Sequence, residues 1–389
     1  MKYFFILGKN VELSIAEIVS YFEKEEIKIS KTYNFKNGFL VDVSGELKTS
    51  EVIKRLGGTL AIGIILFEGN QKELFEKIEK EEIYFESPIK FRYSLLDFCE
   101  SSFSDKIEES LKIKFKKEGL KAYKNPAKGM INMQNGEIFL GSPSKLKQND
   151  VNYFLFKNSE KNYFGILENI YDYKETEKRD MEKPERRESL AISPKLSQIL
   201  INLSQVKKGE TLLDCFCGVG VILQEALIQE INVVGIDLDK EAIESAKKNI
   251  AWLNSQYKVG AQIELINGNS RNVNIKRKVD AIATEPSLGI LMKRVPNRKE
   301  AEVFLRNFES LMVGVLNNMN KCLKNDGKIA FTAPLVSIGR ERVGCRIESI
   351  CAATGLKISE LKNVEIKFPI KDFRKDQIVG REFFVLERK

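Results

Sequence analysis

The alternation of apolar and polar residues predicts a small α/β unit at the start of the chain. Continuous apolar runs indicate strands, and apolar residues repeated every three to four positions indicate helices. By these criteria residues 3–7, 39–43 and 60–67 are strands, and residues 13–24 and 51–56 are helices. This order of elements is typical of a ferredoxin-like domain, to which we assign residues 1–70.

A second unit is expected from residue 71 to about 170. Strands are predicted at 89–96, 138–141 and 153–157, and a helix at 105–117. Seven lysines and one acidic residue fall between positions 112 and 128. A solvated helix face is the ordinary explanation for such a run. The alternative is a phosphate-binding patch, because lysines that neutralise phosphates release counterions. The candidate phosphate contacts are Lys112, Lys116, Lys117, Lys121 and Lys124.

Residues 171–190 alternate in charge and contain few apolar side chains, which is typical of an interdomain linker. Ser193 and Pro194 then provide an N-cap and a first helical residue. They predict a helix over residues 194–203 that opens a third unit, residues 191–389. The predicted organisation is therefore two small α+β domains, a linker and a larger α/β domain.

The third unit begins with a nucleotide-type strand–turn–helix–strand pattern. A strand at 211–213 leads into Asp214 and a turn that contains Gly218 and Gly220. After an intervening helix, a second strand ends at Asp237. Glycines let a ligand approach the backbone, and an acid at the end of the second strand can accept bonds from ribose hydroxyls. Later strands are predicted at 262–266, 328–334, 364–368 and 382–386, with one more beginning at residue 279.

Composition narrows the chemistry. Hydrophobic residues make up 43% of the chain, enough for packed cores, whereas histidine is absent. Every mechanism that needs an imidazole base or a histidine metal ligand is therefore excluded. The six cysteines lack metal-type spacing, and no apolar run is long enough to cross a membrane, so we expect a reduced, cytoplasmic protein without a metal.

The net charge of +8 is unevenly distributed along the chain. Residues 1–110 carry 15 basic and 20 acidic side chains, residues 111–190 carry 17 and 12, and residues 191–389 carry 31 and 23. An acidic first segment therefore precedes two basic ones. This distribution is compatible with a polyanionic partner.

The turn D-C-F-C-G-V-G, residues 214–220, lacks the dinucleotide and P-loop signatures. It resembles motif I of class I S-adenosylmethionine (SAM) methyltransferases, in the D-x-F-C-G-x-G-x-x-x-x-E-A form found in enzymes that methylate the exocyclic amines of bases. The resemblance implies a Rossmann-like, seven-stranded domain with SAM as cofactor. Asp214 and the backbone of Cys217, Gly218 and Gly220 would contact its methionine part, and Asp237 its ribose. Asn269 stands where the family has an aspartate for the adenine amino group; its alternative role is that of an ordinary turn residue.

The loop T-E-P-S-L-G after the fourth strand occupies the place of the family's [DN]PP[YF] motif. The resemblance implies that Glu285 and Pro286 orient the target amine, although Ser287 and Leu288 depart from the pattern. A loss of activity is therefore an open alternative. The basic residues that follow, Lys293, Arg294 and Arg298, are candidate phosphate contacts or, alternatively, a solvated face.

The resemblance extends to the N-terminal half. Y-F-F-I-L-G with E-L-S-I-A-E-I, then L-G-G-T-L-A-I-G-I-I-L, and finally residues 178–203 are similar to THUMP-containing tRNA guanine-N2 methyltransferases that act at position 10. This implies a THUMP-like RNA-binding domain at 71–170 and methylation of a guanosine N2 in tRNA. Some members work with a small activator subunit, so such a partner belongs to the expectation; DNA does not. Two alternatives stay open: a non-catalytic RNA-binding protein on a methyltransferase platform, and an enzyme for another base amine, including one in ribosomal RNA.

Overall fold

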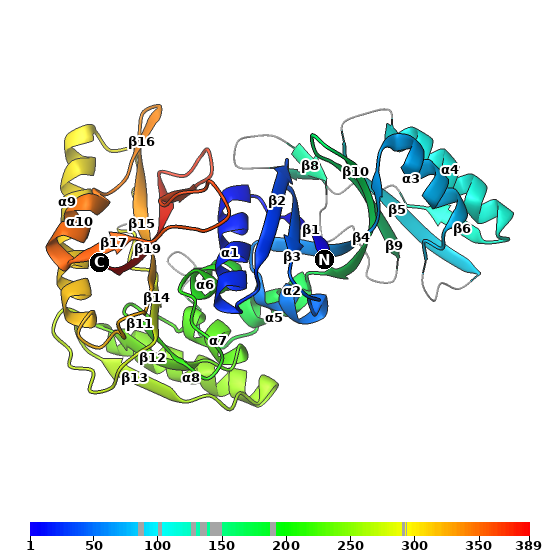
Figure 1. Cartoon of the computed structure of the whole chain (residues 1–389). Coiled ribbons are helices and arrows are strands. Elements are labelled where there is room, and N and C mark those ends of the chain that lie inside the picture. The colour runs from blue at the N-terminus through cyan, green and yellow to red at the C-terminus, as the bar shows by residue number, and fades with distance from the viewer. Residues whose placement is uncertain are drawn as a thin grey trace. The chain divides into compact units, whose positions relative to one another are not determined.

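The computed structural model describes residues 1–84, 89–99, 103–125, 130–132, 138–140, 150–186, 192–289, 292 and 294–389 (Figure 1). The chain forms two compact units. Unit 1 comprises residues 1–15 and 27–173, and unit 2 comprises residues 16–26 and 174–389. Helix α1 (Val11–Lys24) contributes residues to both units. Within the described ranges, no helix is long and apolar enough to cross a membrane.

Unit 1 is built on one eight-stranded sheet with the order β2-β3-β1-β4-β10-β9-β5-β6. Its strands are β1 (Lys2–Leu7), β2 (Ile29–Phe35), β3 (Gly38–Val43), β4 (Thr59–Gly69), β5 (Lys90–Phe98), β6 (Lys121–Lys124), β9 (Val151–Lys157) and β10 (Asn162–Ile170). The predicted separation of domains at residue 70 is not visible in this sheet, because β4 pairs along its length with β10. That pairing covers a strand edge that an isolated ferredoxin-like domain would leave open.

Up to β4 the element order is that of the predicted ferredoxin-like fold, with α2 (Thr49–Arg55) before β4. The sequence analysis missed β2, whose side chains are largely polar and half-exposed, so that it shows little apolar alternation. It also missed β6, β10 and α3 (Gln71–Lys80). The rings of Phe4 and Phe154 stack 4.3 Å apart in the core on one face of the sheet.

The second half of unit 1 has its own core under α3 and α4 (Phe103–Lys117), which lie side by side (Figure 1). Phe115 packs edge-on against Phe91 and Tyr93 there, with ring centroids 5.2 Å apart in both pairs. The predicted strand at 138–141 corresponds to β8 (Ile138–Leu140), which pairs with β7 (Met130–Asn132) in a separate two-stranded sheet.

The predicted linker at 171–190 contains a helix, α5 (Tyr173–Met181). Two of its polar residues, Thr176 and Arg179, are buried rather than solvated, so this part of the predicted linker is a packed helix. The Arg179 guanidinium donates to both carboxylate oxygens of Glu225, at 2.8 and 3.0 Å. Glu225 is the final acid of the motif that begins at Asp214, so this ion pair anchors α5 to the helix after the glycine turn.

Unit 2 holds a sheet with the order β13-β12-β11-β14-β15-β19-β17. The first five of these strands are parallel, and β19 is antiparallel to both of its neighbours. The strands are β11 (Thr211–Asp214), β12 (Asn232–Asp237), β13 (Ile263–Asn267), β14 (Ala281–Thr284), β15 (Ile329–Ile338), β16 (Glu341–Val343), β17 (Leu356–Ile358), β18 (Ile370–Asp372) and β19 (Val379–Arg388). The expected α/β fold is thus confirmed, but the described sheet has nine strands rather than seven, because β16 pairs with β15 and β18 with β19 beside the seven in this order.

The helices of unit 2 lie on both faces of this sheet (Figure 1). They are α6 (Pro194–Leu203), α7 (Val221–Ile228), α8 (Lys240–Tyr257), α9 (Arg298–Met319) and α10 (Ile347–Thr354), besides α5 and residues 16–26. The predicted N-cap is present, since Ser193 Oγ accepts from the Leu196 amide at the start of α6. The predicted strand at 364–368 is wrong: β17 and β18 together occupy the open edge of β19, which leaves these residues as a connection.

Candidate functional site

The candidate site lies where the strand order of unit 2 reverses. Strands β11 and β14 are neighbours, and the chain continues outward from them in opposite directions. In parallel α/β sheets, ligands bind beyond the carboxyl ends of the strands at such a point. Asp214 ends β11, Asp237 ends β12 and Glu285 directly follows β14, so the sheet brings the three predicted acids to one edge.

The glycine turn has the backbone that the sequence predicted. Gly218 and Gly220 have φ angles of +52° and +85°, which favour glycine. A Cβ on Gly220 would also lie 3.3 Å from the Cβ of Ala246. The Cys217 side chain is buried, its amide donates to the Ile236 carbonyl, and its own carbonyl accepts from Gly220. Cys217 therefore shapes the turn through its backbone, while its thiol is buried.

Asp237 joins the second strand to this turn. Its Oδ2 accepts from the Gly218 amide at 2.8 Å and its Oδ1 from the Asp239 amide at 2.9 Å. Each carboxylate oxygen has two acceptor positions, and no second donor to either oxygen comes from the residues that the structure describes, so each retains one. Two free positions on one carboxylate match the two neighbouring hydroxyls of a ribose. The following side chain, Leu238, is 73% exposed, although it is aliphatic.

Asp214 is buried, and one of its oxygens is unused. Its Oδ1 accepts from Thr284 Oγ1 at 2.6 Å and from the Phe216 amide at 3.1 Å, whereas Oδ2 accepts no bond from any described residue. Burial raises the pKa of Asp214 to about 7. A cationic ligand would favour the charged form. The orphaned oxygen and the burial both fit the positively charged methionine part of SAM.

Asn269 is exposed at the start of the loop after β13. Its side-chain oxygen accepts from the Arg271 amide at 3.0 Å, so it does form the turn that the sequence left as the alternative. The oxygen retains one acceptor position for an amino group. The sequence analysis missed Asn267, whose amide donates to the carbonyls of Asp237 and Leu238 at 3.1 and 3.0 Å and braces the ribose side of the site.

Glu285 is held by two residues that the sequence analysis did not single out. Arg381 on β19 donates from Nε to Oε2 at 2.8 Å and from an Nη to Oε1 at 3.0 Å. Thr332 on β15 donates to Oε2 at 3.0 Å. Burial opposes the charge of Arg381, but the hydrogen bonds and the charge of Glu285 raise its pKa above the ordinary value. The loop residue Pro286 is buried, and Leu288 is half-buried.

Two family models match the chain. One, described as "RMKL-like, methyltransferase domain", covers residues 184–334, and another, described as "DNA methylase", covers residues 19–248. A tRNA (guanine(10)-N2)-dimethyltransferase of Methanothermobacter thermautotrophicus is 34% identical over 144 residues, which are 37% of this chain and 39% of that protein. A probable tRNA (guanine(10)-N2)-dimethyltransferase of Methanothermococcus thermolithotrophicus is 30% identical over 36% of this chain and 79% of its own length.

The chain belongs to the tRNA (guanine(10)-N2)-dimethyltransferase family. Its fold is similar over the whole length of both chains to the crystal structure of TrmN from Thermus thermophilus, with a TM-score of 0.53 and 14% sequence identity. This likeness concerns the fold alone. The chain matches only 39% of the length of the first relative named above.

Two of the basic residues after the Glu285 loop of this family member are paired on the surface. Lys293 lies outside the described residues. Arg294 donates to both oxygens of Glu300, at 3.0 and 2.6 Å, and Arg298 donates to Glu341 at 3.0 Å. Exposed pairs of this kind contribute little to stability but reduce the local positive charge. The structure thus favours a solvated face for Arg294 and Arg298.

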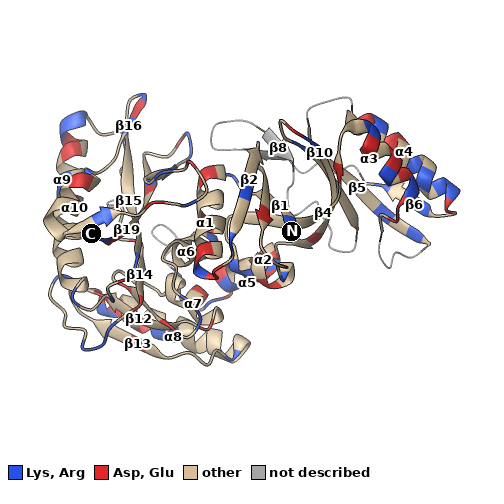
Figure 2. Ribbon diagram, viewed as in Figure 1, with Lys and Arg blue, Asp and Glu red and all other residues tan. Residues whose placement is uncertain are grey.

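The lysines of unit 1 fall into two groups. Lys112 pairs with Glu108 at 2.7 Å, Lys124 pairs with the same carboxylate, and Lys117 pairs with Glu79 at 2.8 Å. Lys116 and Lys121 are exposed and form no ion pair with any described residue. Figure 2 shows both signs of charge side by side on α3 and α4. The patch is therefore mixed, and two of its five candidate lysines carry unpaired charge.

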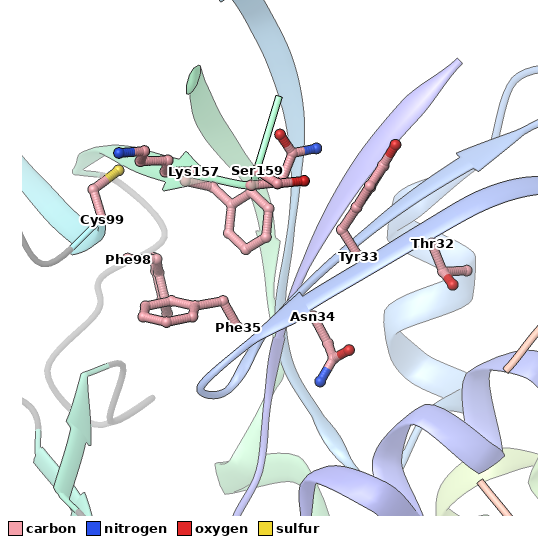
Figure 3. Close-up of a pocket in the computed structure, with 10 residues that line it drawn as sticks. Thr32, Tyr33, Asn34, Phe35, Phe98, Cys99, Lys157 and Ser159 are labelled. Carbon is pink, nitrogen blue, oxygen red and sulfur yellow. The ribbon is translucent and has the colours of Figure 1, made fainter. Parts of the chain in front are cut away.

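Unit 1 also contains a cavity of about 450 Å³ that sequence reasoning missed (Figure 3). Aromatic rings from three separate strands line it, and Lys157 and Ser159 stand at the same site. The aromatic lining residues are Tyr33, Phe35, Phe98 and Phe156. None of the candidate lysines of this family member lines it, so the cavity is a second feature of unit 1, separate from the lysine face of α4 and β6.

Proposed function

We propose that this protein is a SAM-dependent RNA methyltransferase that methylates the exocyclic N2 of a guanosine in tRNA. The observation that carries the proposal is the set of three acids at the strand-order reversal of unit 2. Asp237 keeps two acceptor positions for a ribose, Asp214 an unused oxygen for a cation, and Glu285 stands beside them at the end of β14. Relatives named as tRNA (guanine(10)-N2)-dimethyltransferases supply the substrate class.

The residues of this chain would bind and orient the reactants. Bound SAM supplies an activated methyl group. Asp237 and the glycine turn hold its ribose and methionine parts, and Asn269 accepts from its adenine amino group. The amine of guanine is a weak base with a delocalised lone pair, so orientation is the main catalytic requirement. Glu285 would accept a hydrogen bond from an N–H of this amine. The bond between the methyl carbon and the sulfonium sulfur would break as the nitrogen attacks, the neutral thioether S-adenosylhomocysteine would leave, and the methylated nitrogen would lose a proton to water.

Unit 1 would provide the RNA contacts of a cytoplasmic enzyme. We assign residues 71–170 to a THUMP-like RNA-binding region whose unpaired lysines, Lys116 and Lys121, contact phosphates. The target guanosine lies within a folded RNA and would leave its stack to reach Glu285. DNA is not expected as a substrate.

Methyl transfer tests the proposal directly. Purified protein is incubated with labelled SAM and, in separate reactions, unmodified tRNA, a ribosomal RNA fragment and duplex DNA. Nucleoside mass spectrometry then identifies the product. We expect N2-methylated guanosine in tRNA alone, and a strongly reduced rate for Glu285→Ala. If another nucleoside or another nucleic acid is labelled, the proposed substrate is wrong. If the wild-type protein labels none of the nucleic acids, the proposal that it is a methyltransferase is refuted.

One observation favours a second candidate, a non-catalytic RNA-binding protein. The carboxylate of Glu285 is already bound by Arg381 and Thr332, and Leu288 cannot stack on a base as an aromatic ring does. Two measurements separate the candidates. Calorimetry measures the binding of SAM and tRNA, and the methyl-transfer assay measures turnover. An enzyme binds both SAM and tRNA and transfers methyl groups, whereas the non-catalytic protein binds tRNA and transfers none at saturating SAM.

A further inference from the structure

We propose that Arg381 and Thr332 are positioning residues that fix the Glu285 carboxylate with a single acceptor position open for the target amine. This inference rests on the proposed function, because it concerns the group that receives the amine. It adds two residues to the site, both outside the loop that contains Glu285, and it states how many hydrogen bonds the target can make there.

The number of open positions follows from the hydrogen bonds of Glu285. A carboxylate offers about four acceptor positions, two on each oxygen. Oε2 accepts from Thr332 Oγ1 at 3.0 Å and from Arg381 Nε at 2.8 Å, so both of its positions are used. Oε1 accepts from an Nη of Arg381 at 3.0 Å and retains one. The open position therefore lies on Oε1.

The sheet register explains why these two residues meet at Glu285. Thr332 of β15 lies opposite Phe383 of β19, and Arg381 lies two residues along β19 from Phe383. Residues two apart on a strand face the same side of a sheet. Thr332 and Arg381 are therefore diagonal neighbours on one face. Thr284, the last residue of β14, pairs with Phe331, which places the next residue, Glu285, beside Thr332.

The planar guanidinium fixes the carboxylate more closely than one hydrogen bond could. Two parallel N–H donors define both the distance and the plane of the carboxylate. The Glu285 side chain is 8% exposed and that of Arg381 19%, so water competes weakly for these bonds. Glutamate is longer than the aspartate or asparagine of the family motif, so its side chain could adopt more rotamers. The guanidinium of Arg381 on β19 and the hydroxyl of Thr332 on β15 select one of them.

Unit 2 contains a second arginine–glutamate pair with almost the same bonds. Glu225 accepts from Arg179 Nε at 2.8 Å, from an Arg179 Nη at 3.0 Å and from Gln198 at 3.1 Å. This carboxylate is also buried, but it joins helices α5, α6 and α7 and does not stand at the strand ends. Arg179 is therefore a matched control: its removal breaks an equivalent ion pair without touching the target side.

The experiment compares Arg381→Gln, Arg381→Lys, Thr332→Val and Thr332→Ser with the control Arg179→Gln. The assay is methyl transfer to unmodified tRNA, and SAM affinity by calorimetry verifies that each variant is folded. We expect kcat of Arg381→Gln to fall about a hundredfold, since a 1 Å misplacement can have that effect. Arg381→Lys should retain part of the activity. Thr332→Val should lose less, roughly tenfold, and Thr332→Ser should restore the rate because it keeps the hydroxyl. SAM affinity should be unchanged in all four.

Two comparisons distinguish positioning from a structural role. Arg179→Gln should lower the melting temperature while kcat of the folded protein stays at the wild-type value. The double variant Glu285→Gln/Arg381→Gln should be no slower than Glu285→Gln alone, because both changes remove one function.

Several results would overturn the inference. If Arg381→Gln and Thr332→Val have the wild-type kcat, the two residues do not position Glu285. A kcat above the wild-type value would mean that they restrain Glu285 instead. Either result refutes positioning and leaves the proposed function intact. Independent, multiplicative losses in the double variant also refute it. No methyl transfer by the wild-type protein refutes the proposed function, and this inference with it.

Discussion

The cofactor side and the target side of the sheet edge in unit 2 are built differently. Among the described residues, Asp237 and Asp214 accept three bonds from backbone amides in the turns that follow β11 and β12, and one from the Thr284 side chain at the end of β14. Among the described residues, the donors to Glu285 are side chains 47 and 96 residues further along the chain. The turns after β11 and β12 therefore provide most of the bonds to the proposed cofactor acids, with one bond from β14, whereas the packing of β14, β15 and β19 sets the proposed target acid. Changes on one side should leave the other largely intact.

Asp237→Ala should have the largest effect, a loss of SAM affinity that changes at the Glu285 side should not cause. It removes a charged acceptor for two hydroxyls and also the bond that holds the Gly218 amide. Hydrogen bonds to charged groups contribute about 1.5–3 kcal/mol each, so we expect SAM binding by calorimetry to weaken by at least about a hundredfold. The matched control is Asp239→Ala, which removes the N-cap of α8 and should reduce stability by about 1 kcal/mol without affecting SAM affinity. Equal losses of affinity in both variants would contradict the assignment.

The pH dependence of SAM binding should be the next largest effect, and it belongs to the cofactor side. Burial raises the pKa of Asp214 to about 7, so this carboxyl is largely protonated at lower pH. A cationic ligand binds the ionised form better, and binding must then release a proton. SAM affinity should fall roughly tenfold per pH unit below 7 and be constant above it. Asp214→Asn should bind SAM more weakly, and its SAM affinity should not depend on pH in this range. If the pH dependence persists in this variant, another group is responsible for it.

Glu382 is the control for that experiment, because burial also raises its pKa to about 7 although it belongs to neither acid set. In both groups the folded state keeps a proton that the unfolded chain has released above pH 4 or so. The two groups therefore favour the folded state at low pH, and this contribution is lost as the pH rises towards 7. As the pH rises towards 7, the free energy of unfolding should fall less steeply in Asp214→Asn and in Glu382→Gln than in the wild-type protein. Only Asp214→Asn should alter the pH dependence of SAM binding.

The same contrast explains what the sequence could predict. The turn at Gly218, Asp237 and the helix after Ser193 were predicted because each depends on residues within a few positions. Arg381 was not, since nothing near it in sequence indicates that β19 lies beside β15 and aims it at Glu285. Strand β10 was missed for a related reason: its role in closing the edge of β4 is visible only once the two strands are paired. For Arg381 and β10, long-range pairing limited the prediction, whereas β2 was missed because its residues are largely polar.

The smallest expected effect concerns the lysines of unit 1. Some of them form ion pairs with nearby glutamates, and others form none with the described residues, so they differ in how readily they can bind a phosphate. Lys116 and Lys121 should contact RNA phosphates more readily than Lys112 and Lys117, which would first have to leave their glutamates. We compare Lys116→Gln/Lys121→Gln with Lys112→Gln/Lys117→Gln, because both double variants remove two positive charges. The first should weaken tRNA binding about threefold to tenfold and reduce the salt slope by roughly 0.7–0.9 per lost contact. The second should reduce that slope less. Equal slopes would mean that only the total charge of unit 1 matters, and that neither pair of lysines makes defined phosphate contacts.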